Sequence, residues 1–338
     1  MEVLMKMIYK LAGFFLIMMC YLNISFAGLG SSGAQFLQIG SGIRAISMGS
    51  AYVGIAEGLD ALYWNPAGLS GLSNNIYIGF NHVDYFAGIN YESIALSMPL
   101  MGGVFGVSAV GLLSGDIEIT TVEMPDGTDE FYSANDYSFG ITYSRKLTNK
   151  FSTGLTLKLI NQNIDELSAT GWAFDLGATY KTGLLKNLRL GFVITNFGPD
   201  LSYGGDDLVF RTSVYPDEIA QEKDARAEYI PEKFQLPLKI QFGLAMDLVS
   251  SEHHNLVISF DVINPSDQKE KFGVGMEYIA FNVLSLRGGY TTLNDKNYSA
   301  GMGLIIGPKN TGHLEVDYGY ENHQYLGDLH RFGLVMAF

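Results

Sequence analysis

The chain has 338 residues, including 40 glycines, 21 phenylalanines and 20 tyrosines, and its formal net charge of −14 argues against a nucleic-acid partner, which requires a basic surface. With 47% hydrophobic and 17% charged residues it is too apolar for an ordinary soluble surface, yet beyond the N-terminal residues no segment reaches the roughly 18 apolar residues of a membrane helix. This combination favours a membrane β-barrel, whose strands are apolar on one side only.

Residues 1–27 are predicted to be a cleaved secretion signal. Lys6 and Lys10 supply the positive start, an apolar run of about a dozen residues follows, and Ser25-Phe26-Ala27 forms a small-x-small cleavage site. The run is short for a membrane anchor. Cys20, the only cysteine, lies in that run, so the mature chain is expected to have no disulfide and no thiolate chemistry. We expect such an exported chain in the outer membrane of a Gram-negative-type cell.

Residues 40–72, GSGIRAISMGSAYVGIAEGLDALYWNPAGLSGL, form the only long stretch after the N-terminus that lacks strand patterning. Small residues dominate it, and the apolar residues of 59–64 have a short helical spacing. Pro66 is expected to end that helix, because proline lacks an N–H group and disfavours the α conformation in the residue before it. Almost everything after Asn75 alternates between apolar and polar residues. We therefore predict a hatch, residues 28–75, that plugs a barrel formed by residues 76–338.

The rest of the chain is predicted to be all-β, an antiparallel transmembrane barrel of about fourteen strands. The clearest strand is 137–144, in which Tyr137, Phe139 and Ile141 share one face and small polar residues share the other. An even number of strands is expected for a single-chain bacterial barrel. The predicted segments are 76–82, 91–99, 103–113, 137–145, 151–160, 171–180, 188–195, 237–247, 256–263, 271–278, 284–290, 299–306, 313–320 and 330–338.

One face of each predicted strand is apolar, and the other carries small residues and isolated charges of both signs. This combination fits lipid-facing and lumen-facing sides better than a solvated surface. The charges expected to face the lumen are Asp175, Arg189, Lys239, Asp261, Glu277, Arg287, Asp317 and Arg331. Arg44 would enter the same lumen from the hatch. We expect it to form an ion pair with one of the carboxylates offered there, which are Asp175, Asp247, Asp261, Glu277, Glu315 and Asp317.

The predicted links between strands alternate in length, as in barrels with short periplasmic turns and longer external loops. The short links are 99–102, 146–150, 181–187, 248–255, 279–283 and 307–312, and the longer ones are 114–136, 161–170, 196–236, 264–270, 291–298 and 321–329. This pattern places both termini on the periplasmic side. Link 114–136 is acidic and has no Lys or Arg, whereas link 196–236 contains a charged segment, 217–228, of helical appearance. We expect link 196–236 to cover the external mouth or to bind a partner.

The last predicted strand, 330–338, has apolar residues on one face and ends on Phe338. A terminal aromatic residue on such a strand is typical of outer-membrane proteins that the barrel-assembly machinery recognises. In a soluble protein, a free apolar edge strand of this kind would invite aggregation. Phe338 is therefore predicted to be the barrel-assembly signal, and the lipid bilayer is the expected surrounding of the barrel.

No motif in the sequence predicts catalysis, a metal site or a cofactor. The six histidines do not group with a serine in a recognisable motif, and no Gly-x-Ser-x-Gly sequence occurs, so the nucleophile and base of acyl transfer are not indicated. His253 and His254 are adjacent and cannot both chelate comfortably from an extended chain. The acidic residues of 114–136 lack the spacing of an EF-hand. We expect a protein that is not an enzyme.

The stretch 40–72 resembles the signature of the PorV/PorQ family of outer-membrane barrels. That signature has the form G-x-R-A-x-x-M-G-x-A, then an acidic and small segment, then A-x-x-W-N-P-A-G-L. It falls here on Gly42, Arg44, Ala45, Met48, Gly49 and Ala51, and then on Ala61, Trp64, Asn65, Pro66, Ala67, Gly68 and Leu69. The broader relatives are the FadL-like fatty acid transporters, fourteen-stranded barrels whose hatch also carries Asn-Pro-Ala.

The resemblance implies an accessory or shuttle component of a type IX-like protein secretion system. Its partners would be a secretion translocon and exported cargo proteins, which would contact the external loops. The FadL-like alternative is a channel that carries a small hydrophobic compound through the barrel, with the hatch as gate. A shuttle can keep its lumen blocked, whereas a transporter needs a continuous apolar path. In a third alternative the barrel is purely structural and has neither role.

Overall fold

The computed structural model describes residues 30, 32–72, 75–183, 187–213, 224–292, 296–308, 312–323 and 327–338. The predicted secretion signal, residues 1–27, lies outside these ranges. Within them, no helix is long and apolar enough to cross a membrane.

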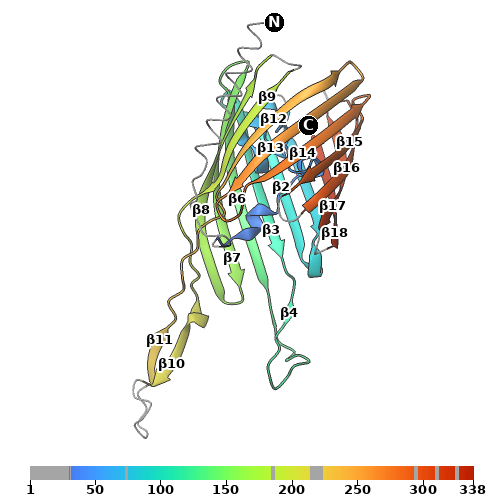
Figure 1. The fold of residues 1–338 in the computed structure, drawn as a ribbon. Coiled ribbons are helices and arrows are strands. Elements are labelled where there is room, and N and C mark those ends of the chain that lie inside the picture. Colours follow the sequence, from blue (N-terminus) through green and yellow to red (C-terminus); the bar gives the residue numbers. More distant parts are fainter. Residues whose placement is uncertain are drawn as a thin grey trace.

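Fourteen of the described strands close into one antiparallel barrel, which confirms the predicted fold class. Successive barrel strands pair with each other, and β18 pairs with β1 to complete the circle (Figure 1). Each of the fourteen predicted segments corresponds to one of these strands. They are β1 (Tyr77–Asp84), β2 (Asn90–Leu100), β3 (Gly103–Leu113), β6 (Ala134–Lys146), β7 (Phe151–Ile164), β8 (Leu167–Lys181), β9 (Arg189–Phe197), β12 (Lys239–Ser250), β13 (His254–Pro265), β14 (Lys271–Ala280), β15 (Leu284–Thr291), β16 (Lys296–Ile306), β17 (His313–His323) and β18 (Gly327–Ala337).

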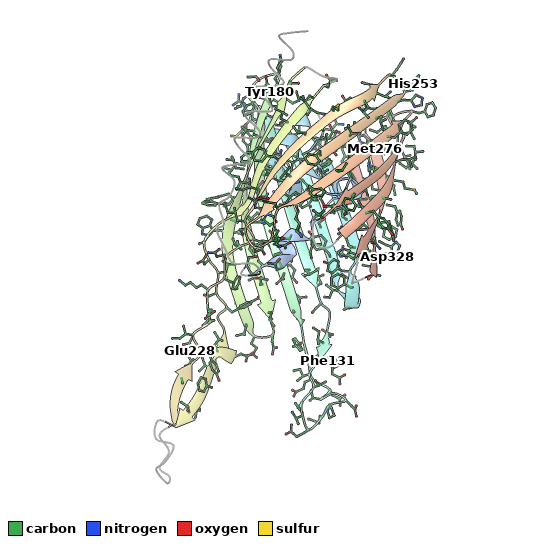
Figure 2. All side chains as sticks on the ribbon, in the orientation of Figure 1. Phe131, Tyr180, Glu228, His253, Met276 and Asp328 are labelled. Carbon is green, nitrogen blue, oxygen red and sulfur yellow. The ribbon has the colours of Figure 1, made fainter. Side chains whose placement is uncertain are left out.

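The outward face of the barrel is apolar, and the inward face is small and polar. On β6 and β7, the outward side chains of Phe139 and Leu155 are more than half exposed. The inward Thr142 and Thr156 are buried, and their hydroxyls lie 2.8 Å apart in a hydrogen bond. Figure 2 shows Met276 on β14 pointing away from the barrel in the same way as the other outward side chains. An exposed apolar belt around a closed barrel is typical of a barrel that faces lipid.

The two ends of the barrel differ. The short-turn end holds Phe338, and its links are 101–102, 147–150, 182–188, 251–253, 281–283 and 307–312. The links of the opposite end, here called the arm end, are 85–89, 114–133, 165–166, 198–238, 266–270, 292–295 and 324–326. Only two of the arm-end links are long, so the expectation of generally longer links at this end is wrong for the others.

The predicted link 161–170 is largely strand. β7 and β8 stay paired up to Ile164 and Leu167, which leaves a turn of two residues. Beyond the apolar part of these two strands the residues are polar, but their backbones stay paired. Asn161 Nδ2, for example, donates a hydrogen bond to Thr170 Oγ1 over 2.9 Å. The apolar pattern marks only the part of a strand that lies in the apolar belt, and the strands continue beyond that part.

Two hairpins project from the arm end beyond the barrel (Figure 1). The β4–β5 arm, residues 114–133, contains β4 (Ile117–Glu118) and β5 (Phe131–Tyr132). The β10–β11 arm, residues 198–238, contains η4 (Asp206–Leu208), β10 (Val209–Ser213) and β11 (Asp224–Glu228). Both arms therefore carry a small two-stranded sheet of their own, separate from the barrel.

The helical segment predicted at 217–228 is wrong where the structure describes it. Residues Asp224–Glu228 form strand β11, which pairs with β10 and places Arg226 opposite Arg211. The charges of β11 alternate with alanines, and this period of two is that of a strand. The preceding residues, 217–223, lie outside the described ranges.

Residues 32–72, here called the hatch segment, lie inside the barrel (blue in Figure 1). They contain the short helices η1 (Gln35–Gln38), α2 (Ile43–Ser47), α3 (Ala61–Trp64) and η2 (Pro66–Gly71), while η3 (Phe86–Gly88) lies in the link between β1 and β2. Helix α3 ends at Trp64, and Asn65 is extended, with φ −158°, as proline requires of the residue before it. Pro66 also begins η2, because its fixed φ suits the first helical position. Helices this short are not stable alone, so the barrel wall must hold them.

Candidate functional site

The wall meets the hatch segment through glycines. A Cβ atom added to Gly191 would lie 2.1 Å from Val53 O, and one added to Gly289 would lie 2.1 Å from Gly49 N. A Cβ atom added to Gly154 would lie 2.4 Å from Pro66 C, and Gly243, Gly273 and Gly275 likewise face hatch backbone at 2.4 Å. On Gly177 and Gly301 it would lie 2.1 Å from a hatch side chain, that of Asn65 or Ser47. Only glycine lets two backbones approach this closely. We call these eight residues the glycine belt; they come from strands β7, β8, β9, β12, β14, β15 and β16.

The Asn-Pro-Ala-Gly part of the predicted motif joins two parts of the hatch segment. Asn65 is buried, donates from Nδ2 to Val53 O over 3.0 Å, and accepts from Ala67 N over 3.2 Å. Gly68 is required because a Cβ there would lie 2.1 Å from Ala56 O. The side chain of Asn65 thus makes the local turn bond that its sequence position predicts, and it also makes a bond to residue 53 that the sequence does not indicate.

The remaining motif residues form the core of the hatch segment. Met48 and Trp64 are buried in one hydrophobic core together with Tyr52, which is not part of the motif. Trp64 Nε1 donates a hydrogen bond of 2.6 Å to Ser41 O. Gly49 has φ +64°, a conformation that other residues adopt at a cost. The motif therefore fixes the internal shape of the hatch segment as well as its fit against the wall.

A buried carboxylate of β13 binds hatch backbone directly. Asp261 Oδ2 accepts from Tyr52 N at 2.9 Å and from Val53 N at 2.8 Å. Gln241 Nε2, on the neighbouring strand β12, donates to the same oxygen at 2.8 Å. Charge-assisted bonds to backbone N–H groups are among the strong hydrogen bonds of proteins. Asp261 thus faces the lumen, and it is fully buried there against the hatch segment.

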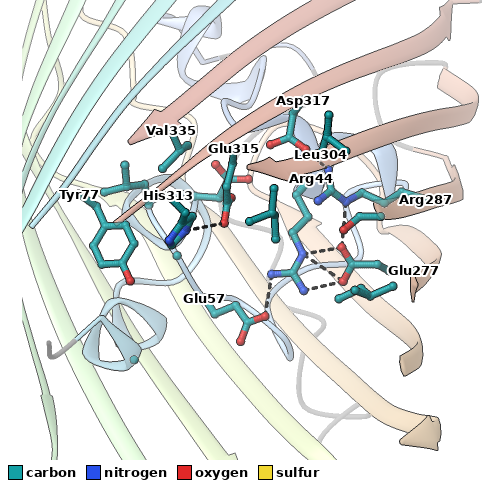
Figure 3. A pocket seen from close by; sticks show the side chains of 18 of the residues that line it. Arg44, Glu57, Tyr77, Glu277, Arg287, Leu304, His313, Glu315, Asp317 and Val335 are labelled. Atoms are coloured by element: carbon teal, nitrogen blue, oxygen red, sulfur yellow. Dashed lines mark hydrogen bonds and ion pairs between the residues drawn. The ribbon is translucent and has the colours of Figure 1, made fainter. Parts of the chain in front are cut away.

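Arg44 is the centre of an ion-pair chain between the hatch segment and three strands. Its Nε donates to Glu277 Oε1 at 2.8 Å, and its second contact is Glu57, at 2.7 Å. Glu277 is completely buried and also binds Arg287 at 2.8 Å. Arg287 in turn contacts Asp317 at 2.5 Å. Figure 3 shows these side chains converging from β14, β15 and β17 on Arg44. Of the carboxylates that the sequence offers to Arg44, the fold brings Glu277 within contact.

The other charges expected in the lumen also have inward partners. Arg331 binds Glu321 at 2.8 Å and donates to the hatch carbonyl of Gly40 at 3.2 Å. Asp175 binds Lys158 at 2.6 Å. Arg189 forms an ion pair with Asp247. The Nζ atom of Lys239 lies 5.3 Å from the centre of the Trp64 ring. Arg331, Asp175 and Arg189 are thus each paired with an opposite charge. Arg331 and Lys239 also contact the hatch segment itself.

Sequence reasoning missed the residue that holds the start of the hatch segment. Asp267, in the link between β13 and β14, is buried and accepts hydrogen bonds from the side chains of Ser32, Gln35 and Gln38. Its backbone carbonyl accepts from Gly30 N at 3.0 Å. No pattern in the sequence distinguishes Asp267 from an ordinary loop aspartate, because its partners lie more than 200 residues away.

The lumen on the arm-end side of the hatch segment is filled with apolar side chains. The apolar cluster, as we call it, is buried between the start of the hatch segment, the wall and the base of the β10–β11 arm. It consists of Ala34, Phe36, Ile39, Val83, Tyr91, Ile160, Ala173, Leu201 and Leu236, with Leu37, Tyr85, Val110, Leu112 and Phe234 packed against it. A cavity of about 40 Å³ adjoins it and is lined in part by Leu37, Tyr63 and Tyr91.

The opposite side of the hatch segment is charged. A cavity of about 330 Å³ at the short-turn end is lined by Arg44, Asp60, Glu277, Arg287, His313, Glu315 and Asp317, among other residues (Figure 3). Burial, together with the nearby charge of Asp317, raises the pKa of Asp60 to about 7. Asp60 is therefore only partly ionised near neutral pH, chiefly because it is buried. The hatch segment thus separates the apolar cluster from this charged cavity.

Histidines do not form a reactive group in the described part of the chain. No cluster of three or more His, Cys, Asp or Glu side chains there could hold a metal ion. His82 contacts Glu92 at 2.6 Å, and His254 and His330 each form a hydrogen bond with a tyrosine hydroxyl. The described contacts give no arrangement of nucleophile, base and orienting group.

A search of solved structures finds this fold in transporters. The toluene transporter TbuX of Ralstonia pickettii matches 88% of this chain and 97% of its own, with 14% identity and a TM-score of 0.58. The Pseudomonas putida toluene transporter TodX matches the same shares at 16% identity and a TM-score of 0.56. A FadL homologue of Pseudomonas aeruginosa matches 88% of this chain and 98% of its own, at 12% identity and a TM-score of 0.54. No protein-family model and no curated protein sequence matches the chain. The structural similarity shows a shared fold with these transporters, and the PorV/PorQ resemblance is not confirmed by it.

Proposed function

We propose that this protein is an outer-membrane channel that admits a small apolar compound and whose hatch segment is the gate. The observation that carries the proposal is the apolar cluster, which lines the lumen on the arm-end side of the hatch segment. Ligand sites for apolar molecules are typically lined by aliphatic and aromatic side chains with few polar groups. The fold shared with toluene transporters supports the same assignment.

The proposed location follows from the outward face of the barrel. An apolar belt on a closed fourteen-strand barrel fits the outer membrane, which the chain would reach after cleavage of residues 1–27. The short-turn end would face the periplasm and the two arms would face the cell exterior. Phe338, at the end of the last strand, would present the barrel-assembly signal during insertion.

In this proposal the compound enters from the arm end and the hatch segment controls its onward passage. The compound would bind at the apolar cluster near Leu37 and widen the adjoining cavity of about 40 Å³, since an apolar cavity that takes benzene measures about 150 Å³. The charged cavity beyond the hatch segment gives an apolar compound little attraction, because its lining carries both buried and exposed ions. Release into the periplasm would therefore require a local shift of the hatch segment, not only a wider pore.

The proposal is tested by uptake of radiolabelled toluene into cells of a Gram-negative host that express the chain. We expect uptake above that of the empty vector, and we expect Leu37→Asp to reduce the gain about tenfold, because a carboxylate in the apolar cluster adds a large desolvation cost to an apolar ligand's site. The matched control is Leu147→Asp, an exposed leucine in a short turn, which should transport normally. Uptake equal to that of the empty vector for toluene and for a panel of aliphatic and aromatic compounds would refute the channel.

A second candidate, the secretion accessory of the PorV/PorQ type, is favoured by one observation. The β4–β5 arm is ordered by its own hydrogen bonds, such as Ile119 N to Glu130 O at 2.8 Å. Nevertheless it exposes Val122 at 95% and Phe131 at 59% in an acidic hairpin. Exposed apolar side chains on an ordered, charged hairpin are typical of surfaces that bind a protein. Figure 2 shows Phe131 on this arm, away from the barrel.

This candidate predicts that replacing residues 116–131 by a short glycine-serine turn abolishes partner capture. The measurement is a pull-down from outer membranes of the native host, with mass spectrometry of the recovered proteins. The full chain should recover a very large barrel or exported proteins that share a C-terminal domain, and the shortened chain should recover neither. Recovery of the barrel with a stoichiometric apolar molecule and without these proteins would favour the channel instead.

A further inference from the structure

A second cavity at the short-turn end is lined by positive charges. It measures about 260 Å³, and the end of β6, the link to β7, the end of β8 and the start of β9 contribute Lys146, Lys150, Lys181 and Arg189 to it. Hatch residues 54–57, 67, 68, 70 and 71 also line it. Lys150 and Lys181 are direct neighbours, because Lys181 N donates to Lys150 O at 2.8 Å. Four cations thus converge on one cavity in a chain whose net charge is −14.

These lysines lack the partners that the other inward cations have. Arg44, Arg287, Arg331 and Lys158 each bind a carboxylate of the lumen. Within the described ranges, no carboxylate lies in ion-pair contact with the three lysines.

The groups around the lysines do not neutralise them either. Among the described residues of the lining, Glu57 is the only carboxylate, and it is bound to Arg44. Arg189 binds Asp247, but its Nε is buried without a hydrogen-bond partner. Adjacent like charges on paired strands are destabilising, so an anion placed among them would be stabilised.

The inward direction of the three lysine side chains indicates which class of anion the cavity can bind. The three lysines line a cavity on the lumen side of the wall, together with hatch residues. An anionic lipid headgroup would instead approach from the outward face, where Arg145 lies at the same level of β6. A free phosphate would fill only part of a cavity of about 260 Å³, since one water molecule accounts for roughly 30 Å³ of liquid. A chain with several carboxylates can reach the three lysines at once.

We propose that this cavity, here called the lysine pocket, binds an acidic peptide segment that enters from the solvent at the short-turn end. The carboxylates of the segment would pair with Lys146, Lys150 and Lys181. The inference goes beyond the proposed channel and does not depend on it, because it uses no residue of the apolar cluster. If the orientation proposed above holds, the partner is a periplasmic protein with an exposed acidic segment.

The test uses the full chain in phosphatidylcholine nanodiscs and a fluorescein-labelled peptide of four glutamates, with binding followed by fluorescence anisotropy at low salt. Lys150→Gln combined with Lys181→Gln should weaken binding about tenfold, since two of the three lysines of the pocket are lost. The matched control Arg145→Gln removes an outward charge from the same rim and should change the Kd less than twofold. Glu57→Gln should tighten binding about threefold, because it removes a carboxylate from the lining. All effects should shrink at high salt, which screens exposed charges.

Several results would overturn the assignment. Unchanged binding by the Lys150 and Lys181 double variant would show that the peptide binds elsewhere, and an equal loss in the Arg145 variant would show general charge attraction. Loss of peptide binding in phosphatidylglycerol nanodiscs would assign the lysine pocket to a lipid headgroup. Inorganic phosphate that binds as tightly as the peptide in calorimetry would assign it to a free anion. A gel-shift comparison of heated and unheated samples checks that each variant is a folded barrel.

Discussion

Replacing Gly289 by valine is expected to unseat the hatch segment while the barrel remains closed. A Cβ atom at this position would lie 2.1 Å from Gly49 N and 2.2 Å from Met48 C, and both are backbone atoms held inside the lumen. Overpacking of a well-packed interior typically costs about 1–3 kcal/mol, and backbone neighbours relieve it less easily than side chains do. The wall strand β15 is fixed on both sides by its ladders. The hatch segment should therefore move.

The displacement is measured by trypsin cleavage after Arg44, which the intact ion-pair chain protects. We expect the cleavage rate to rise at least tenfold in Gly289→Val, the equivalent of about 1.4 kcal/mol, and we expect larger conductance in planar bilayers. The control is Gly288→Val, because the neighbouring glycine has nothing within 4 Å of an added Cβ. If Gly289→Val keeps Arg44 protected and conducts as the original protein does, the glycine belt does not hold the hatch segment.

Replacing Arg44 by methionine is expected to have the second large effect, which is easier release of the hatch segment from the wall. It leaves Glu277, whose side chain is completely buried, with Arg287 as its remaining cation. Removal of one partner from a buried ion pair typically costs 3–5 kcal/mol, and because Arg287 remains we expect about 3 kcal/mol for release of the hatch segment. Arg44→Met combined with Glu277→Gln should recover most of this loss, since no unbalanced buried charge is left.

The two tryptophans allow this release to be followed separately from unfolding of the wall. Trp64 is buried in the hatch segment, whereas Trp172 lies on the outward face of β8 and is 44% exposed. In a Trp172→Phe background, urea titration followed by fluorescence reports on the hatch segment alone. The midpoint should fall in Arg44→Met and stay unchanged in Arg145→Met, which removes an exposed arginine. Equal midpoints in both variants would mean that the ion-pair chain contributes nothing to the seating of the hatch segment.

These two effects concern contacts that the sequence indicates only in outline. Its motif singles out Arg44 and Gly49, and the lumen charges place Glu277 on an inward face. The partner of Arg44 depends on the position of the hatch segment relative to β14. From the sequence alone, six carboxylates were candidates for this partner. The wall glycines are inconspicuous in a chain with 40 glycines, because their role becomes visible only when the opposing backbone is in place.

The sequence by itself determined the strands and the inner and outer faces of the barrel. Period-two alternation is a local property: a residue's position in the strand decides its face, and a lipid-facing side must be apolar over its whole length. The same reasoning placed the non-strand segment 40–72 inside the barrel, where residues 32–72 are found. It failed at links such as 161–170, because polar residues beyond the apolar belt can continue a ladder without any apolar pattern.

Only the tertiary structure decided which distant residues meet. Asp267 holds Gln35 across more than 200 residues of sequence, and Lys146 comes together with Lys181 because three strands end side by side. Such contacts depend on the register of each strand pair and on the depth of the hatch segment in the lumen, and both are set by the closure of the whole barrel. A local pattern shows that a side chain points inward. Which residue it contacts depends on the registers of all fourteen strand pairs of the closed barrel.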